Sequence, residues 1–534
     1  MYMMKKLMLL LLAMMPLVAC AQWGRQGDAE SQAQLQKFNR FYQQLTSTYI
    51  DSIPNEKLVE TAIKSVLKEL DPHSTYLSVK EMQASNEQFQ GNFSGIGIEF
   101  NILNDTLIVV NTIQGGPSEK VGLMPNDKVT AIDGVNAIGI TREDAPTKLR
   151  GPRGTVVMLT VARNGVKEPM EFRIVRDNIP ITTVDAAYNI DEHTGYLRVN
   201  RFAQNTMEEF REAVGKMGGI DALVLDLRGN GGGFLHMAID MGNYFLDRGD
   251  LIVSTEGMRV RPQQTTADRS GEFRKGKVVV LIDELSASAS EIVAGALQDW
   301  DRAVIIGRRS FGKGLVQQQF PLQDGSAVRI TIAKYLTPTG RAIQRPFEMG
   351  HSEDYYQALA SRISAGDDKV DDDGAHEEYK TLRLGKTVYG GGGIYPDYYV
   401  PADTTGYSEY LSKLSRMGVI NEYLVSYLDR NRASLEARYP DFEAFNRGYA
   451  MDDQTLGELR ELGEKRGVPF DAEGFEISKG FIQTQFKALV AGRLWTNTEF
   501  YRVANPLRDP IYKKALEVLG DWDNMAAGIA TDQR

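Results

Sequence analysis

The feature of this chain that most restricts its fold is a pair of continuous apolar runs set between helical stretches. The runs are "ALVLDL" at 222–227 and "KVVVLID" at 277–283, and the helical stretch "ASEIVAGALQDW" at 289–300 follows soon after the second run. Strands that are apolar on both faces must be covered on both faces, which is typical of α/β proteins. The pattern therefore predicts an α/β core domain over residues 178–403.

Changes of pattern along the 534 residues predict further domains around this core. Apolar residues at helical spacing over 36–90 predict two amphipathic helices, and short β-rich runs between Gly, Pro and Asn turns predict a separate domain over 92–177. Helical patterns return in the tail over 404–534. Residues 351–388, with five aspartates in "GDDKVDDDGAHEE", are expected to form a solvated insertion loop. Calcium binding by this loop is an alternative, although its spacing is not that of an EF-hand.

The N-terminus has the pattern of an export signal. Lys5 and Lys6 precede an apolar run over 7–21 that is too short to span a bilayer but fits a secretory signal. We expect a signal peptide over 1–21 and an N-terminal region over 22–91 that begins with a flexible, Gln-rich tether up to residue 35. The mature protein is then expected to work outside the cytoplasm, in the periplasm or at the cell envelope.

Cys20 is the only cysteine, so the mature protein has no internal disulfide. It ends the string "LVAC", which resembles the lipobox of bacterial lipoproteins, whose cysteine is lipid-modified and anchors the protein to a membrane surface. In that case the signal ends at residue 19. Ordinary signal cleavage at the small residues Ala19, Cys20 and Ala21 is the alternative.

Composition excludes some classes of function. A formal net charge of −10 argues against a nucleic-acid partner, because phosphate binding needs a dense footprint of Lys and Arg. The chain has neither an HExxH string nor a cysteine cluster, so we expect no metal site and no cofactor.

Two strings carry residues suited to nucleophilic catalysis. "ELSASASEIVAGALQDW" puts serines on a turn before a helix, where free amides and the helix dipole stabilise an oxyanion; helix capping is the alternative. "RRSFGKGLVQQQF" places Lys313 between Gly312 and Gly314, where burial would lower the lysine pKa and make a general base. A surface lysine in a glycine turn is the alternative. Gln317, four residues on, is expected on the same face of a strand and in reach of the lysine.

A third string, "DLRGNGGGF", ends a strand with a glycine cluster. Gly231 and Gly232 would bring backbone amides close to a substrate carbonyl and complete an oxyanion hole with the amide of Ala289, whereas a tight turn is the alternative. The five histidines lie in unrelated strings, and His73 and His236 are expected to satisfy local hydrogen bonds. Serine with lysine is therefore the remaining nucleophilic pair.

The ordered strings together resemble the carboxyl-terminal processing peptidases, or tail-specific proteases, which use a Ser/Lys dyad. They are, in chain order, "LDPHSTYL", "SGIGIEF", "GPSEKVGLMPNDKVTAIDG", "LRGPRGT", "LDLRGNGGG", "SASASEIVAGALQD", "GRRSFGKGLVQ", "LTPTGRAI" and "GGIYPD". The resemblance implies α/β and α+β multidomain architecture: a crotonase-like α/β protease core with an inserted PDZ domain, an N-terminal helical segment and a C-terminal helical extension. The insertion and the tail depart from the family's compact pattern.

Carried over by position, the resemblance makes Ser288 the nucleophile, Lys313 the general base and Gln317 the residue that orients the lysine. Spacing alone does not choose Ser288 over Ser286 or Ser290. The oxyanion donors fall on Ala289 and on Gly231 or Gly232.

"SGIGIEF" resembles a PDZ carboxylate-binding loop, in which Gly95, Ile96, Gly97 and Ile98 offer amides to a terminal carboxylate and the peptide adds a strand to the sheet. A short apolar hairpin is the alternative. Arg150 in "LRGPRGT" is expected to couple the PDZ domain to the dyad.

The resulting hypothesis is an exported serine endopeptidase that binds protein substrates by their C-termini, with homo-oligomerisation left open. A non-catalytic PDZ adaptor and a crotonase-like acyl-CoA enzyme are the alternatives.

Overall fold

The computed structural model describes residues 29–103, 105–113, 115–365 and 377–526. The chain divides into two compact units, Met1–Lys68 and Glu69–Arg534. Among the helices of the described residues, none has both the length and the apolar character that a membrane span needs.

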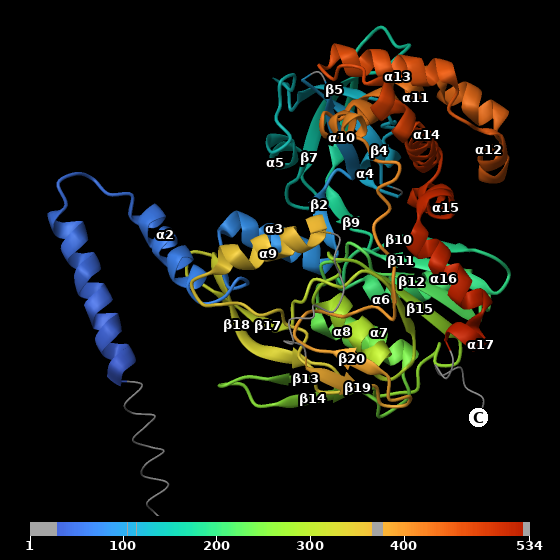
Figure 1. The fold of residues 1–534 in the computed structure, drawn as a ribbon. Helices are drawn as coiled ribbons and strands as arrows, with labels where there is room; N and C mark the ends of the chain where they lie inside the picture. The colour runs from blue at the N-terminus through green and yellow to red at the C-terminus, as the bar shows by residue number, and fades with distance from the viewer. Residues whose placement is uncertain (1–28, 104, 114, 366–376, 527–534) are drawn as a thin grey trace, which may run out of the picture. The chain divides into compact units, whose positions relative to one another are not determined.

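The first unit contains two helices, one over 29–48 and α2 (Asn55–Lys68) (Figure 1). The helical pattern predicted within 36–90 is confirmed, but the tether expected up to residue 35 is already helical from residue 29. Its Ala, Glu, Gln and Leu residues are good helix formers, which outweighs their polarity. The predicted signal peptide and Cys20 lie outside the described residues.

A six-stranded sheet forms the centre of the second unit, and its strands after the first run parallel to one another. Leu225 lies opposite Val280, and Val280 lies opposite Ile305. The two apolar runs of the sequence are thus neighbouring parallel strands, as predicted. In sheet order the strands are β10 (Val184–Asn189), β11 (Thr194–Val199), β12 (Ala222–Asp226), β15 (Lys277–Ile282), β16 (Val304–Gly307) and β21 (Tyr398–Tyr399).

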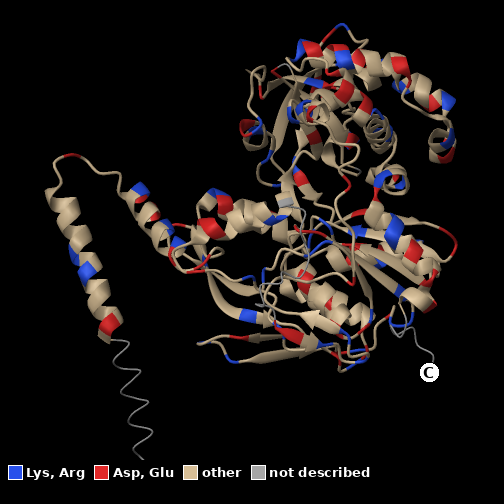
Figure 2. Ribbon diagram, viewed as in Figure 1, with Lys and Arg blue, Asp and Glu red and all other residues tan. Residues whose placement is uncertain are grey.

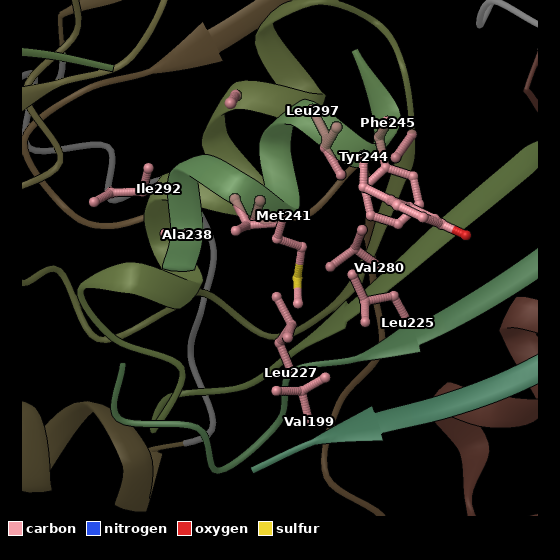
Figure 3. Packing of buried hydrophobic residues seen from close by; sticks show 14 of the residues in the cluster. Val199, Leu225, Leu227, Ala238, Met241, Tyr244, Phe245, Val280, Ile292 and Leu297 are labelled. Carbon is pink, nitrogen blue, oxygen red and sulfur yellow. The ribbon is translucent and has the colours of Figure 1, made fainter. Parts of the chain in front are cut away.

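Helices cover one face of this sheet with a continuous apolar cluster. Leu225 and Val280 of the sheet pack with Met241 and Leu297 of the helices (Figure 3). All four side chains are fully or almost fully buried, and each such burial contributes about 1.5–3 kcal/mol to folding. The helices on this face are α6 (Thr206–Lys216), α7 (Leu235–Phe245) and α8 (Ala289–Asp299).

The opposite face of the sheet is covered by a helix from the far end of the chain. Val224 and Val279 pack with Ile511 and Tyr512 of α16 (Pro510–Gly520). The end of the predicted C-terminal extension therefore belongs to the layers of the core, although it shares none of the core's motifs.

A second, antiparallel sheet joins the segment that contains "LDPHSTYL" to the strand that follows Lys313. β1 (Thr75–Leu77) and β17 (Leu315–Pro321) both pair with β18 (Ala327–Leu336). The sheet continues through β13 (Leu251–Glu256) and β14 (Gln263–Thr266).

The predicted PDZ region contains its own sheet and its own apolar core. A separate ribbon of β2 (Asn92–Gly95) and β9 (Asp177–Pro180) brings the two ends of this region together. In sheet order the strands are β3 (Ile98–Leu103), β4 (Thr106–Thr112), β5 (Lys128–Ile132), β7 (Val156–Ala162) and β8 (Met170–Val175), with β6 (Val135–Asn136) paired to β5. Helices α3 (Val79–Gln90), α4 (Pro117–Lys120) and α5 (Asp144–Leu149) accompany it.

The tail is helical, as predicted, and has a separate apolar cluster. Acidic and basic residues are interspersed along its outer helices (Figure 2). Two of them, Glu422 and Arg466, form an ion pair between α11 and the end of α13. The tail helices are α10 (Glu409–Arg416), α11 (Val419–Arg438), α12 (Phe442–Gly448), α13 (Asp453–Lys465), α14 (Ala472–Leu494), α15 (Asn497–Arg508), α16 and α17 (Trp522–Met525).

The insertion over 351–388 is not the simple loop that its charge suggests. It begins with the helix α9 (Ser352–Ala365) and ends in the hairpin of β19 (Glu378–Lys380) and β20 (Thr387–Tyr389). Apolar and aromatic residues at both ends of the segment form these elements. The central acidic run, on which the calcium alternative rests, falls largely on residues 366–376, outside the described residues.

Candidate active site

Ser288 occupies the turn between β15 and α8, where it directly precedes the first residue of the helix. Its φ of 56° and ψ of −111° are unusual for a residue with a side chain. Such strain costs about 1–3 kcal/mol and is kept where the surrounding structure enforces it, often at active sites. The turn presents the half-buried Ser288 at the positive end of the α8 dipole.

The structure distinguishes the three serines that spacing alone could not separate. Ser286 Oγ donates to the carbonyl of Leu227, and Ser290 Oγ donates to the carbonyl of Asn230, both at 2.9 Å. The side chain of Ser288 takes part in the capping box of α8 with Glu291, but its hydroxyl donates to no other described residue. Ser286 and Ser290 therefore hold the turn in place, while the hydroxyl of Ser288 remains available.

Asn230, which sequence reasoning missed, ties the glycine cluster to the serine turn. Its carbonyl accepts hydrogen bonds from Ala287 N and Ser290 Oγ at 2.9 Å each, and its Oδ1 accepts from Gly232 N at 2.9 Å. Gly232 N–H is thus engaged. The amides of Gly231 and Ala289 have no partner among the described residues, so these two are the free donors beside Ser288.

Gly232 contributes by its lack of a side chain. A Cβ at this position would lie 2.7 Å from Ala287 O, 2.9 Å from Ala289 N and 2.9 Å from Ser288 Cβ. Its φ of +97° is also one that residues with side chains rarely adopt. The glycine cluster therefore packs directly against the serine turn.

We expect Gly232→Ala to lower kcat for peptide hydrolysis by about 10²- to 10³-fold, because displacement of the serine turn disrupts the oxyanion donors. Gly215→Ala, near the end of α6, is the matched control, since a Cβ there meets nothing within 4 Å. Steady-state kinetics on one peptide substrate measure both variants. Parent-like kcat in Gly232→Ala would show that the close packing has no catalytic consequence.

Lys313 lies in the loop that leads into β17 and is only partly exposed. Burial lowers its pKa, and the nearby charge of Arg329 lowers it further, while Glu291 and Asp71 oppose this shift. The amine makes no hydrogen bond to another described residue. A lysine with a lowered pKa is suited to general-base chemistry.

Gln317 does not lie where the strand argument placed it. Lys313 precedes β17, and a bulge shifts the β17–β18 register between Val316 and Gln317, so the two side chains do not share a strand face. The side-chain nitrogen of Gln317 instead donates to the carbonyl of His73. The reason given for a Gln317–Lys313 contact is therefore wrong, although Gln317 contacts His73, whose pKa the nearby charge of Lys313 lowers.

Glu291, also missed from the sequence, joins the serine turn to the lysine loop. This fully buried carboxylate accepts from Ser288 N at 2.8 Å and Lys313 N at 2.9 Å through Oε2. Its Oε1 accepts from Gly312 N at 2.6 Å and Ser310 Oγ at 2.5 Å. Burial raises the pKa of Glu291, and the four hydrogen bonds oppose that shift. The sequence signal that could have found it is the Ser-x-x-Glu spacing of a helix capping box, which Ser288 and Glu291 form at the start of α8.

The two histidines expected to satisfy local hydrogen bonds behave differently. His236 Nε2 lies 3.3 Å from Gln204 Oε1, which confirms the expectation. His73 Nε2 is buried without a hydrogen-bond partner among the described residues, so the expectation is wrong there. The hydrogen bond of His73 to Asp71 comes from its backbone N–H, at 2.8 Å.

The loop predicted to bind a carboxylate has the required polarity. The carbonyls of Ile96 and Gly97 accept hydrogen bonds from Ser118 N and Ile113 N at 3.0 Å, whereas the two amides have no partner among the described residues. β3, which follows the loop, pairs only with β4 and lies at the edge of its sheet. Gly95 is in the β2–β9 ribbon and Ile98 opens β3.

Arg150 follows α5, and its partners are residues other than Ser288 and Lys313. Its guanidinium contacts Glu87 of α3 at 2.5 Å and lies over the ring of Phe93, 4.3 Å from its centroid. It therefore links the end of the PDZ helix to the segment before the PDZ domain.

Comparison with known proteins identifies the family of this chain. The chain is 39% identical over 318 residues to a carboxy-terminal-processing protease of Bartonella bacilliformis, covering 58% of this chain and 73% of that relative. The chain belongs to the carboxyl-terminal processing peptidases. This processing peptidase is also 35% identical over 367 residues to a protein described as a probable CtpA-like serine protease of Staphylococcus aureus, covering 67% of this chain and 73% of that relative. It is a serine-type peptidase, as the sequence predicted.

Separate parts of this processing peptidase match separate families. Residues 193–355 match peptidase family S41, residues 108–163 match a PDZ domain, and residues 14–81 match the N-terminal domain of the activating protease CtpB. Residues 410–496 match a family of unknown function, DUF8443. A photosystem II D1 C-terminal processing protease shares 24% identity at a TM-score of 0.36, covering 71% of this chain and 90% of that one. The predicted multidomain α/β class with a PDZ domain is confirmed.

Proposed function

We propose that this processing peptidase is an exported serine endopeptidase in which Ser288 is the nucleophile and Lys313 the general base. The observation that carries the proposal is the shared carboxylate of Glu291, which holds the backbone of Ser288 and the backbone of Lys313 within hydrogen-bond reach of one side chain. A hydroxyl that donates to no other described residue and an amine with a lowered pKa thus belong to one site.

In the proposed reaction, neutral Lys313 takes the proton of Ser288 as Oγ attacks the substrate carbonyl. The new C–O bond leaves an oxyanion, to which the free amides of Ala289 and Gly231 donate hydrogen bonds beside the positive end of α8. Lys313 returns the proton to the leaving amine as the C–N bond breaks, and water hydrolyses the acyl-enzyme. Gln317 supports this site from β17 by donating to the carbonyl of His73. No cofactor takes part.

Substrates are proposed to be proteins bound by their C-termini. The free amides of Ile96 and Gly97, with Gly95 and Ile98 beside them, form the site for the terminal carboxylate, and the open edge of β3 accepts the peptide as an added strand. Arg150 then links this domain to α3, the helix before it, through its ion pair with Glu87.

An unfolded reporter protein with an apolar C-terminus tests the proposal when it is prepared with either a free or an amidated terminal carboxyl group. We expect kcat/KM to be at least about tenfold higher for the free carboxylate, because the amide removes the charge that the loop binds. A short internal peptide without the terminus serves as the control and should show no such difference. Equal cleavage of both reporters contradicts C-terminal recognition, and cleavage of neither contradicts the peptidase assignment.

Export and assembly complete the proposal. The N-terminal pattern supports delivery to the periplasm or the envelope, with Cys20 as the lipid anchor. Large apolar side chains are exposed on the helix over 29–48, among them Leu35, Phe38 and Phe41 at 50–58% exposure. Within the first unit nothing described covers these side chains, and an exposed apolar face of this kind supports assembly of more than one copy.

A further inference from the structure

The segment Asp71–Ser74 is held by several hydrogen bonds, and the mechanism above uses none of its side chains. The carboxylate of Asp71, 7% exposed, accepts from His73 N and Ser74 N at 2.8 Å, and from Ser74 Oγ at 2.5 Å. It also accepts from Thr331 Oγ1 of β18 at 3.0 Å. A buried carboxylate with four donors fixes the course of this segment.

Contacts from three further elements hold His73 itself. Gln317 of β17 donates to its carbonyl. Its ring meets the ring of Tyr355 of α9 edge to face, with centroids 5.3 Å apart, and lies 6.5 Å from the ring of Phe311 in the lysine loop. Tyr356 of α9 donates to the carbonyl of the preceding Pro72 at 2.8 Å. The ring has little freedom to turn.

The fixed ring carries a buried polar atom that nothing in the described part of the chain satisfies. His73 Nε2 has no hydrogen-bond partner among the described residues, and leaving such an atom unpaired costs about 1–3 kcal/mol. Burial and the nearby charges of Lys313 and Arg345 lower the pKa of His73 to about 4, against the opposing effect of Asp71. The imidazole is therefore neutral at physiological pH and has a lone pair to offer.

We propose that His73 is a positioning residue for Lys313, whose ammonium donates a hydrogen bond to His73 Nε2 once the lysine has taken the proton of Ser288. The inference rests on the proposed function. His73 keeps its own proton on Nδ1 throughout, and the transferred proton moves only from Ser288 Oγ to Lys313 Nζ and then to the leaving amine. Gln317 acts through His73, by holding its carbonyl.

The charged groups around Lys313 do not themselves supply such an acceptor. Burial and Arg329 oppose the ammonium, while Glu291 and Asp71 favour it, yet both carboxylates have their oxygens engaged with other donors. A neutral acceptor can bind the ammonium in the reaction without holding the resting lysine in its charged form as a free carboxylate would. A charged histidine here would repel the ammonium.

Two replacements of His73 separate positioning from packing. His73→Phe keeps the ring and its contacts with Tyr355 and Phe311 but removes the acceptor, whereas His73→Gln keeps a neutral acceptor. His193→Phe is the matched control, because the side chain of His193 is 73% exposed in a loop at the start of β11. The readout is kcat and KM from pH 5 to 10 on a short uncharged peptide, with thermal unfolding to confirm folding.

We expect His73→Phe to lower kcat by about 10- to 100-fold, the value of one hydrogen bond to a charged group, with KM little changed. The acid limb of kcat/KM should move to lower pH, because the ammonium loses an acceptor and the pKa of Lys313 falls. His73→Gln should keep the parental acid limb. If His73→Phe does not fold, His73→Leu against His73→Gln gives the same comparison.

An unshifted acid limb in every folded variant would overturn the inference, and so would equal losses in His73→Gln and His73→Phe. Failure of the parent enzyme to cleave the peptide would instead overturn the proposed function. The two failures are therefore distinguishable in one set of measurements.

Discussion

Ser288→Ala is expected to lower kcat for peptide hydrolysis by at least about 10³-fold, because no other hydroxyl in the turn is free to replace it. Ser286 and Ser290 are buried, and each already donates to a backbone carbonyl. Lys313→Ala should cause a loss of similar size, and the double variant should be no worse than either single one, since the two residues act as a unit. Turnover of an unfolded reporter measures all three.

The matched controls for this prediction are Ser270→Ala and Lys334→Ala. Ser270 is exposed in a loop, and Lys334 is exposed on β18 opposite Leu315, outside the hydrogen-bond network of the site. Both should turn over the reporter like the parent. Parental rates in Ser288→Ala or Lys313→Ala would contradict the Ser/Lys dyad and favour the non-catalytic adaptor. Turnover of a thioester would favour the crotonase-like alternative.

Glu291→Gln is expected to lower both activity and stability, although it changes one oxygen to an NH₂ group. Each oxygen of Glu291 accepts two hydrogen bonds, at least one of them from a backbone N–H, so in either orientation the new NH₂ group faces a backbone donor that it cannot satisfy. We expect a loss of about 2–4 kcal/mol in the free energy of unfolding, from donors left buried and unpaired. We also expect kcat to fall by at least about 10²-fold, because the serine turn and the lysine loop separate.

Chemical denaturation and steady-state kinetics measure these two effects. Glu256→Gln, on an exposed position of β13, is the matched control and should change neither. A Glu291→Gln variant that unfolds like the parent and keeps its kcat would show that the hydrogen bonds of Glu291 contribute to neither stability nor catalysis.

The strands and helices around the dyad were predictable because local patterns determine them. "ALVLDL" and "KVVVLID" are apolar throughout and form neighbouring parallel strands, and the helix after the serine string begins at Ala289, as expected. The resemblance to processing peptidases supplied the choice of Ser288, which the structure supports through the engagement of its two neighbours.

The remaining parts of the site depend on contacts between segments far apart in the chain. Gln317 was placed by strand periodicity, which a bulge beside it interrupts. Glu291 and Asn230 act through hydrogen bonds to distant loops, and neither bond has a local pattern. His73 lies about 240 residues from Lys313, and their segments share one sheet only because β1 and β17 both pair with β18.

The helix α16 has a consequence for how the enzyme is made. Because it covers the second face of the central sheet with residues near position 511, the catalytic layer stays open on that side until almost the whole chain has left the ribosome. We therefore expect the protease part to stay unfolded, and so inactive, until this helix has been synthesised. Shortening the gene at the end of its recognisable motifs would therefore yield an aggregating fragment rather than a smaller enzyme.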